Sequence, residues 1–240
     1  MIVVDPGAPA RRIYHDQEAP DEGERVVGVV SRGRALTPVD AELVAAVRSR
    51  LAVHRRTAAA LAPGSRRAGV AAVLAQERGR PVVMMIKRSA RGRNPGQYAL
   101  PGGRLEPGES DIDGALRETH EEIGLPPDAL DVLGRLDDFV TDSGFVITPV
   151  VAALVRPVTA RRAPDEVAAL LPVPLDRLVQ PDLPHWLDRG EAEPLLQLPL
   201  RPGLVVHAPT GALLWHLREV ALLGHRHRLG GVVQPDWTRH

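Results

Sequence analysis

One continuous stretch, GRLEPGESDIDGALRETHEEIGL from Gly103 to Leu125, constrains the fold of this 240-residue chain more than any other feature. Its first part predicts a turn at Pro107-Gly108, after which Ser110 is suited to cap a helix and Asp113 to complete a capping box. Gly124, followed by two prolines, predicts where that helix ends. The stretch therefore predicts a helix framed by two loops.

Three carboxylates share one face of the predicted helix, because Glu118, Glu121 and Glu122 stand at positions i, i+3 and i+4. Like charges at this spacing cost about 0.2–0.5 kcal/mol per pair, and a bound divalent cation would relieve the repulsion. Ligands that are all oxygens favour Mg²⁺ or Mn²⁺, and the chain has no cysteine for a zinc thiolate site. Arg117 lies four residues before Glu121, where it is placed to orient a carboxylate. The alternative interpretation is a solvated acidic helix.

The stretch resembles the Nudix box, in which glycine, five residues, glutamate and seven residues precede Arg-Glu-x-x-Glu-Glu-x-Gly. The resemblance implies a metal-dependent hydrolase that cleaves a nucleoside diphosphate linkage. It implies metal ligands at Glu118, Glu121 and Glu122, with a carbonyl ligand from Gly103 and support from Glu109. It also implies that Arg117 orients a glutamate. The general base remains open between Glu118 and Glu166, a carboxylate on a distant loop.

Composition limits the kind of partner. Thirty acidic and thirty basic residues cancel, so no global field favours nucleic acid or a membrane surface. No apolar run approaches the roughly 20 residues that span a bilayer, and the N-terminus lacks a signal-peptide pattern. We therefore expect a cytoplasmic enzyme with a small-molecule nucleoside diphosphate substrate. A homodimer is plausible by family resemblance, but no residue requires it.

The order of the predicted elements is strands, a helix, more strands and a terminal helix, which favours a mixed sheet covered by helices. The resemblance implies the α/β/α sandwich of the Nudix fold, with an N-terminal helical extension. We expect a flexible tail over 1–35, a helix within 36–64 capped by Thr37, the Nudix domain over 66–225 and a tail over 226–240. The predicted strands cover 68–76, 82–87, 132–140, 145–155, 167–173 and 204–207, with a lid-like loop over 181–203 and a helix after Thr210.

Substrate choice depends on segments outside the box. The basic stretch from Lys87 to Gly103 resembles the signature of coenzyme A pyrophosphatases, although Gly92 replaces the usual leucine and Leu100 the usual phenylalanine. The strand from Gly144 to Val151 and the segment from Pro164 to Leu175 resemble the same branch. The candidate substrate-binding residues supply cations, a backbone N–H and aromatic rings: Arg88, Arg91, Arg93, Gly96, Tyr98 and Phe145.

The leading hypothesis is hydrolysis of coenzyme A or an acyl-coenzyme A to 3′,5′-ADP and 4′-phosphopantetheine or its acyl form. Three alternatives remain open, because the basic stretch is also compatible with an ordinary surface loop in an arginine-rich protein. The substrate of the same chemistry is then another nucleoside diphosphate derivative, such as a nucleotide sugar, ADP-ribose or a modified nucleotide. The second alternative is a non-catalytic nucleotide-binding Nudix domain, and the third is a broad housekeeping hydrolase with no preferred substrate.

Histidines do not form a recognisable ligand pattern in the sequence. His54 lies on the predicted N-terminal helix, and His216, His225 and His227 lie near the C-terminus among arginines. We expect packing or surface roles for all four, because imidazole clusters without supporting carboxylates are usually surface features.

Overall fold

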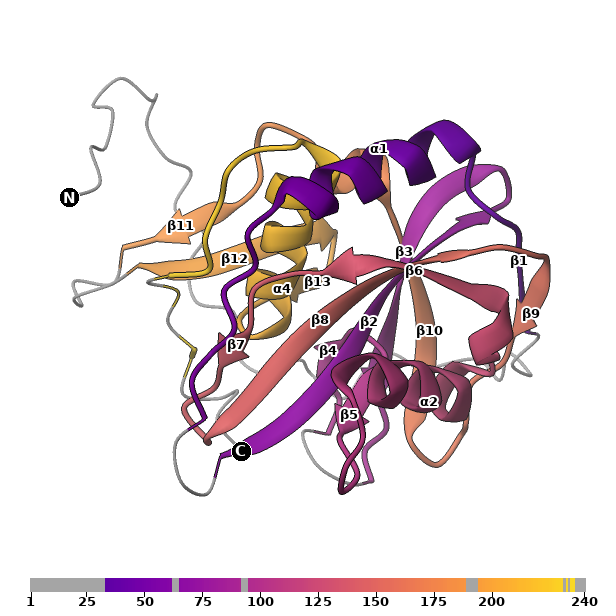
Figure 1. Ribbon diagram of the computed structural model, residues 1–240, viewed down its shortest axis with the longest axis horizontal. Helices are drawn as coiled ribbons and strands as arrows, with labels where there is room; N and C mark the ends of the chain where they lie inside the picture. The colour runs from indigo at the N-terminus through magenta and orange to yellow at the C-terminus, as the bar shows by residue number, and fades with distance from the viewer. Residues whose placement is uncertain are drawn as a thin grey trace. The chain divides into compact units, whose positions relative to one another are not determined.

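A mixed eight-stranded sheet forms the centre of the computed structural model, which describes residues 33–61, 65–91, 95–188, 194–230, 232 and 234–235 (Figure 1). All of these residues belong to one unit, Ser31–His240. The main path of the sheet runs β10 (Val167–Pro174), β3 (Arg80–Arg88), β2 (Arg66–Glu77), β8 (Phe145–Leu154) and β6 (Leu130–Arg135). Only β2 and β8 pair in parallel. Three short strands pair at its sides: β4 (Tyr98–Ala99), β5 (Gly102–Arg104) and β7 (Phe139–Val140).

Alternating side chains of β2 divide the core into two layers. Ala71 and Val73 pack in one hydrophobic cluster with Ala115 of α2 (Asp111–Ile123), while Leu74 packs in the other. That second cluster contains Val47 of α1 (Ala41–Val53) and the apolar residues of α4 (Thr210–His216) and the π-helical turn η2 (Leu217–Leu222). Helices therefore cover both faces of a mixed sheet, and the α/β prediction is confirmed.

The caps of α2 are those that its sequence predicts. Ser110 accepts a hydrogen bond from the backbone N–H of Asp113 at 3.1 Å and donates its hydroxyl to the Asp113 carboxylate at 2.6 Å. Gly124 ends the helix in the left-handed conformation, with φ of 70°, and its N–H reaches the carbonyl of His120. Local capping chemistry thus fixes both ends of the helix that carries the box glutamates.

The N-terminal helix is much shorter than the predicted segment 36–64. Its cap is Asp40, whose carboxylate accepts from the N–H of Leu43 at 2.8 Å, whereas the predicted cap, Thr37, forms a β-bridge with Gln76. Part of the predicted flexible tail 1–35 also belongs to strand β1 (Arg34–Leu36), which pairs with β9 (Val158–Ala160). The predicted cap and the limit of the tail were wrong because these residues pair with distant strands.

The helix ends at Val53 because two aspartates hold the chain that follows it. The N–H of Thr57 donates to Asp137 at 2.8 Å, and the N–H of Ala59 donates to Asp138 at 2.9 Å. These aspartates lie between β6 and β7, so the single strand predicted over 132–140 is also wrong. A register shift near Gly134 interrupts the pairing of β6 with β8.

The predicted lid-like loop over 181–203 contains two strands. Strands β11 (His185–Leu187), β12 (Leu195–Arg201) and β13 (Leu204–Val206) form a separate three-stranded sheet, with 189–193 outside the described residues. Leu196 and Leu198 of β12 join the cluster around α4. The prolines of this segment led to the prediction of a loop. The strands were missed because Leu196 and Leu198 are buried by contact with the cluster around α4, which no local sequence pattern connects to β12. A four-residue helix, α3 (Leu175–Leu178), follows β10, and a 3₁₀ turn, η1 (Pro127–Ala129), follows α2.

Two further observations concern the C-terminal segment and the helices. His227, within the predicted tail 226–240, packs its ring edge-on against Trp215 of α4 at 4.1 Å between centroids. At least this part of the predicted tail therefore lies against the domain. None of the helices in the described part of the chain is long and apolar enough to cross a membrane.

Candidate active site

Arg117 is the centre of the carboxylate cluster on α2. Its guanidinium donates to both oxygens of Glu109, at 2.9 and 3.0 Å, and to single oxygens of Glu118 and Glu121, each at 3.0 Å. It also reaches the carbonyl of Arg104 at 3.2 Å. The hydrogen bond to Arg117, reinforced by its charge, holds the pKa of Glu109 below the usual range. One arginine therefore fixes three glutamates that the sequence places on a loop and one helix face.

Gly103 leaves room for the carboxylate of Glu118. A Cβ added at Gly103 would overlap all three carboxylate atoms of that side chain, so no larger residue fits without displacing it. Glu118 is half-buried, and burial raises its pKa even though Arg117 acts in the opposite direction. The close approach of strand β5 to α2 thus requires a glycine at the first position of the box.

Glu122 is fully buried and only partly satisfied. One of its oxygens, Oε2, accepts from the N–H of Gly102 at 2.9 Å. The other, Oε1, has no hydrogen-bond partner; the guanidinium of Arg88 lies 3.5 Å away, outside hydrogen-bond geometry. Burial raises the pKa of Glu122 to about 7, against the N–H of Gly102 and the charge of Arg88. A buried oxygen without a donor, among other carboxylates, fits a hard divalent cation.

Two more predicted residues, Arg88 at the end of β3 and Glu166 just before β10, lie beside this cluster. The N–H of Ser89 donates to the carbonyl of Glu166 at 2.9 Å, and the Ser89 hydroxyl donates to the carbonyl of Asp165 at 2.6 Å. The exposed Glu166 carboxylate is close enough for its charge to raise the pKa of both Glu118 and Glu122. The cluster therefore combines four box glutamates with Arg88, Arg117 and Glu166.

Comparison with known proteins agrees with this arrangement, because the NUDIX domain family matches residues 65–197, more than half of the chain. The chain belongs to the Nudix family. The uncharacterized Nudix hydrolase NudL of Yersinia enterocolitica is 33% identical over 143 residues, covering 58% of this chain and 73% of NudL. NudL of Citrobacter koseri is 36% identical over 145 residues, covering 58% and 70%. Among solved structures, the Nudix hydrolase RenU of M. smegmatis is 22% identical with a TM-score of 0.45, covering 65% and 85%.

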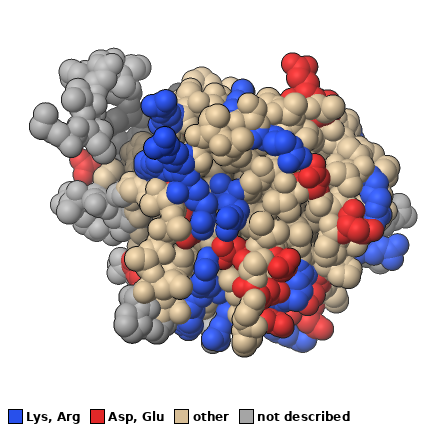
Figure 2. All heavy atoms as spheres, viewed as in Figure 1, with Lys and Arg blue, Asp and Glu red and all other residues tan. Residues whose placement is uncertain are grey.

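Family membership makes this protein a Nudix hydrolase, which acts on a diphosphate substrate and implies a divalent metal. In the space-filling view, acidic side chains interleaved with basic ones gather over the region of α2 and β5 (Figure 2). Such a surface offers both anions for a cation and cations for phosphate oxygens.

Several of the proposed substrate-binding residues lie in other surroundings. Arg91 is 87% exposed and lies 3.9 Å from the carboxylate of Asp165, and Gly96 adopts a left-handed turn with φ of 72°. Tyr98 lies under Lys87, with the ammonium 5.7 Å from the ring centroid, and Phe145 lies under Arg66 at 4.2 Å. Arg93 is outside the described residues. Among the described residues, no hydrogen bond or ion pair joins a box glutamate to any of the other four: Arg91, Gly96, Tyr98 and Phe145.

The predicted site did not include the N–H of Gly102 or the hydroxyl of Ser89. Gly102 holds the buried carboxylate of Glu122, and its φ of 148° explains why glycine stands there. The Gly102-Gly103 pair in the sequence was the available signal. Ser89 joins the basic loop to β10, which only the pairing of β3 with β10 reveals.

Proposed function

We propose that this Nudix hydrolase cleaves the diphosphate of coenzyme A or an acyl-coenzyme A, using Mg²⁺ or Mn²⁺. The products would be 3′,5′-ADP and 4′-phosphopantetheine or its acyl form. The observation that carries the proposal is the Arg88-Ser89 pair. Arg88 lies beside the buried Glu122, and Ser89 fastens the start of the basic segment to Glu166. Coenzyme A carries a 3′-phosphate besides its diphosphate, and a basic segment beside the box suits that extra charge.

The cation would be held by Glu118, Glu121 and Glu122, with the carbonyl of Gly103. All four donors are oxygens, which is the ligand set of Mg²⁺ and Mn²⁺. When bound, the cation would offset charge on the phosphate oxygens and favour ionisation of the attacking water. A bound cation would also give a partner to Glu122 Oε1, which is buried and accepts no hydrogen bond.

The residues of the chain have separate tasks in the proposed reaction. Water attacks one phosphorus, its proton passes to a carboxylate, and the bond from that phosphorus to the bridging oxygen breaks. Glu118 and Glu166 are the two candidates for the proton acceptor. Burial raises the pKa of Glu118, which makes it a stronger base than an exposed glutamate, and Glu166 has the freedom of an exposed side chain. Arg117 positions Glu118 and Glu121 and does not itself need to contact the substrate.

Arg88 is suited to a phosphate group at the same site. Its guanidinium is 28% exposed and directed at Glu122, so its other N–H groups remain oriented beside the metal ligands. Arg91 extends into solvent from the same loop, where it is available to a more distant phosphate. We therefore assign the diphosphate to Arg88 and the 3′-phosphate of coenzyme A to Arg91.

A comparison of coenzyme A with dephospho-coenzyme A, which lacks the 3′-phosphate, tests this assignment. Arg91→Ala should raise KM for coenzyme A by about tenfold, the equivalent of one exposed charge-assisted contact, and leave KM for dephospho-coenzyme A unchanged. Arg80→Ala is the matched control, because Arg80 is an exposed arginine at the other end of β3, paired with Asp176. Equal effects of Arg91→Ala on both substrates would remove the 3′-phosphate from the proposal. Faster hydrolysis of ADP-ribose or a nucleotide sugar than of either coenzyme would replace the substrate.

A further inference from the structure

Three potential metal ligands from distant segments meet away from the Nudix box. His54 follows α1, Asp137 follows β6, and His216 ends α4; their side chains are 7%, 3% and 0% exposed. His54 Nε2 lies 2.9 Å from Asp137 Oδ1, and His216 Nε2 lies 3.6 Å from Asp137 Oδ2. All three ligand atoms lie within 4.8 Å of one another. We expected packing or surface roles for His54 and His216, and the sequence did not predict that both lie beside the carboxylate of Asp137.

Hydrogen bonds fix the tautomer of His216. The backbone N–H of Asp137 donates to Nε2 at 3.3 Å, so the ring proton is assigned to Nδ1, and a metal ion at Nε2 would replace this hydrogen bond. Nδ1 lies 2.8 Å from Nδ1 of His227, which is placed to accept that proton. A histidine ligand held through its other ring nitrogen is the usual arrangement at metal sites.

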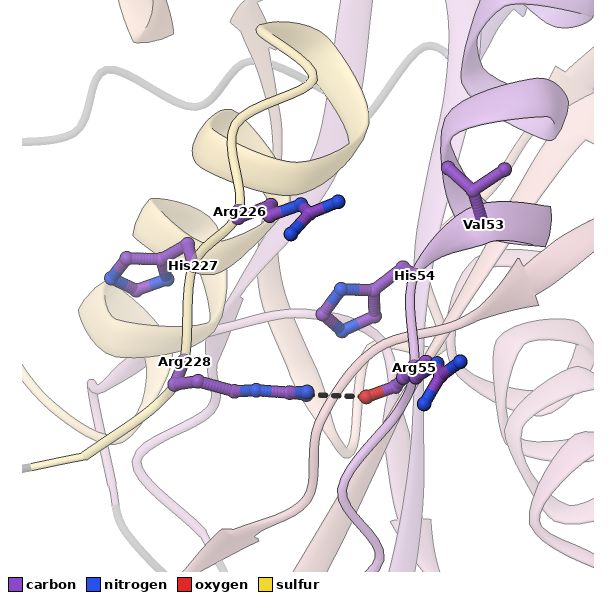
Figure 3. Close-up of a pocket in the computed structure, with 6 residues that line it drawn as sticks. All are labelled: Val53, His54, Arg55, Arg226, His227 and Arg228. Carbon is purple, nitrogen blue, oxygen red and sulfur yellow. Dashed lines mark hydrogen bonds between the residues drawn. The ribbon is translucent and has the colours of Figure 1, made fainter.

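His54 of the cluster also lines a pocket of about 430 Å³. The pocket is lined by Val53, His54, Arg55, Arg226, His227 and Arg228 (Figure 3). Arg228 crosses below His54 in this view to the carbonyl of Arg55, and its guanidinium lies 3.4 Å from Asp137. Because Arg228 is 56% exposed, it can leave the carboxylate when another cation arrives.

We propose that His54, Asp137 and His216 form a second metal site, selective for a zinc-like divalent ion. The three ligand atoms lie within 4.8 Å of one another, and zinc bonds of about 2.0–2.1 Å would draw them closer together. Two imidazoles and one carboxylate form a zinc ligand set that leaves a fourth position open. The all-oxygen box favours Mg²⁺ or Mn²⁺, so the two sites select different ions.

The proposed ion would join three segments that lie far apart along the chain. His54 belongs to the N-terminal extension, Asp137 to the Nudix sheet and His216 to the C-terminal helix. Binding to the folded protein alone would stabilise it in proportion to metal concentration. The site would thus fasten both extensions to the catalytic domain.

Cobalt(II) titration of the metal-stripped full-length protein tests the proposal, because a nitrogen-containing tetrahedral site gives strong visible absorption. The Glu118→Gln/Glu122→Gln protein, in which the box is silenced, should retain one equivalent of absorbing cobalt, displaced by one equivalent of zinc. Adding His54→Gln or Asp137→Asn should weaken zinc binding by about 100-fold or more, the upper range for losses around a metal centre. Asp137→Asn preserves an acceptor for Thr57 and His54, and circular dichroism would verify its fold.

Arg228→Ala supplies a variant whose effect has the opposite sign. Removal of this competing cation should tighten zinc binding, whereas a cluster that serves only as a hydrogen-bond network would gain no affinity. Wild-type protein that gives only weak octahedral cobalt absorption would overturn the proposal. Zinc affinity unchanged by both His54→Gln and Asp137→Asn would also overturn it.

Discussion

Two clusters of ionisable side chains lie with helices that pack on opposite faces of one sheet, and burial acts on them in opposite directions. On α2, burial raises the pKa of Glu122 to about 7 and leaves one oxygen without a donor. Beside α1 and α4, burial lowers the pKa of His216 to about 3, and both of its ring nitrogens have partners. The box cluster has more carboxylates than the two guanidinium groups of Arg88 and Arg117 can neutralise, whereas in the histidine cluster the single carboxylate of Asp137 lies beside Arg228. Each cluster is therefore suited to a different cation.

Loss of the buried box carboxylate is expected to have the largest effect on function. Glu122→Gln should lower kcat by about 10²–10³-fold, as expected when one preorganised electrostatic contact is removed from an active site. Steady-state product release measures the loss. Glu106→Gln is the matched control, since Glu106 is an exposed glutamate of the loop that precedes α2. Full activity in Glu122→Gln would contradict the assignment of this residue to the metal.

The comparison also predicts a pH dependence of stability in chelator-treated protein. The folded pKa of Glu122 lies above the ordinary value of 4.5, so the folded state binds the extra proton between pH 4.5 and about 7. Its contribution is present below pH 4.5 and is lost as pH rises through 7, by on the order of 3 kcal/mol. Denaturant unfolding at pH 5 and pH 8 measures the free energy.

Glu122→Gln isolates that contribution, because other groups titrate in the same range. The lowered pKa of His216 has the opposite sign: its contribution is present above pH 6.5 and is lost as pH falls toward 3. The difference between wild type and Glu122→Gln should therefore change between pH 5 and pH 8. A constant difference would show that Glu122 titrates normally.

A smaller effect on stability is expected at the contact of β5 with α2. Gly103→Ala should destabilise the fold by about 1–3 kcal/mol, because the new methyl group would overlap the carboxylate of Glu118. It should also reduce activity, since Glu118 must move. Gly230→Ala is the control, because a Cβ there would meet no atom within 4 Å. Equal unfolding midpoints for the two variants would contradict the close approach.

The difference between the clusters explains how much the sequence could reveal. The box contacts arise within one loop and one helix, so local spacing predicts that Arg117 meets Glu121 and that Ser110 caps α2. The histidine cluster joins residues 83 and 79 positions apart along the chain. No local pattern connects them, and the sequence-based expectation for those histidines omitted Asp137.

The same reasoning applies to the errors in the fold. The apolar residues keep a helical period past Val53, but α1 ends there because the carboxylates of Asp137 and Asp138 accept hydrogen bonds from the N–H groups of Thr57 and Ala59. The segment 185–206 contains prolines that favour loops, yet Leu196, Leu198 and Leu200 of β12 are buried in the cluster that contains α4. In both cases a tertiary contact decided the conformation, and it involves residues far away in sequence.

The most direct test is mass spectrometry of products after Mg²⁺ or Mn²⁺ is added to the protein with an equimolar mixture of coenzyme A, acetyl-coenzyme A, ADP-ribose, NADH and nucleoside triphosphates. We expect 3′,5′-ADP and the two forms of 4′-phosphopantetheine to appear first, and to be nearly absent with Glu122→Gln. Turnover of another component ahead of both coenzymes, or equal products from Glu122→Gln, would contradict the assignment.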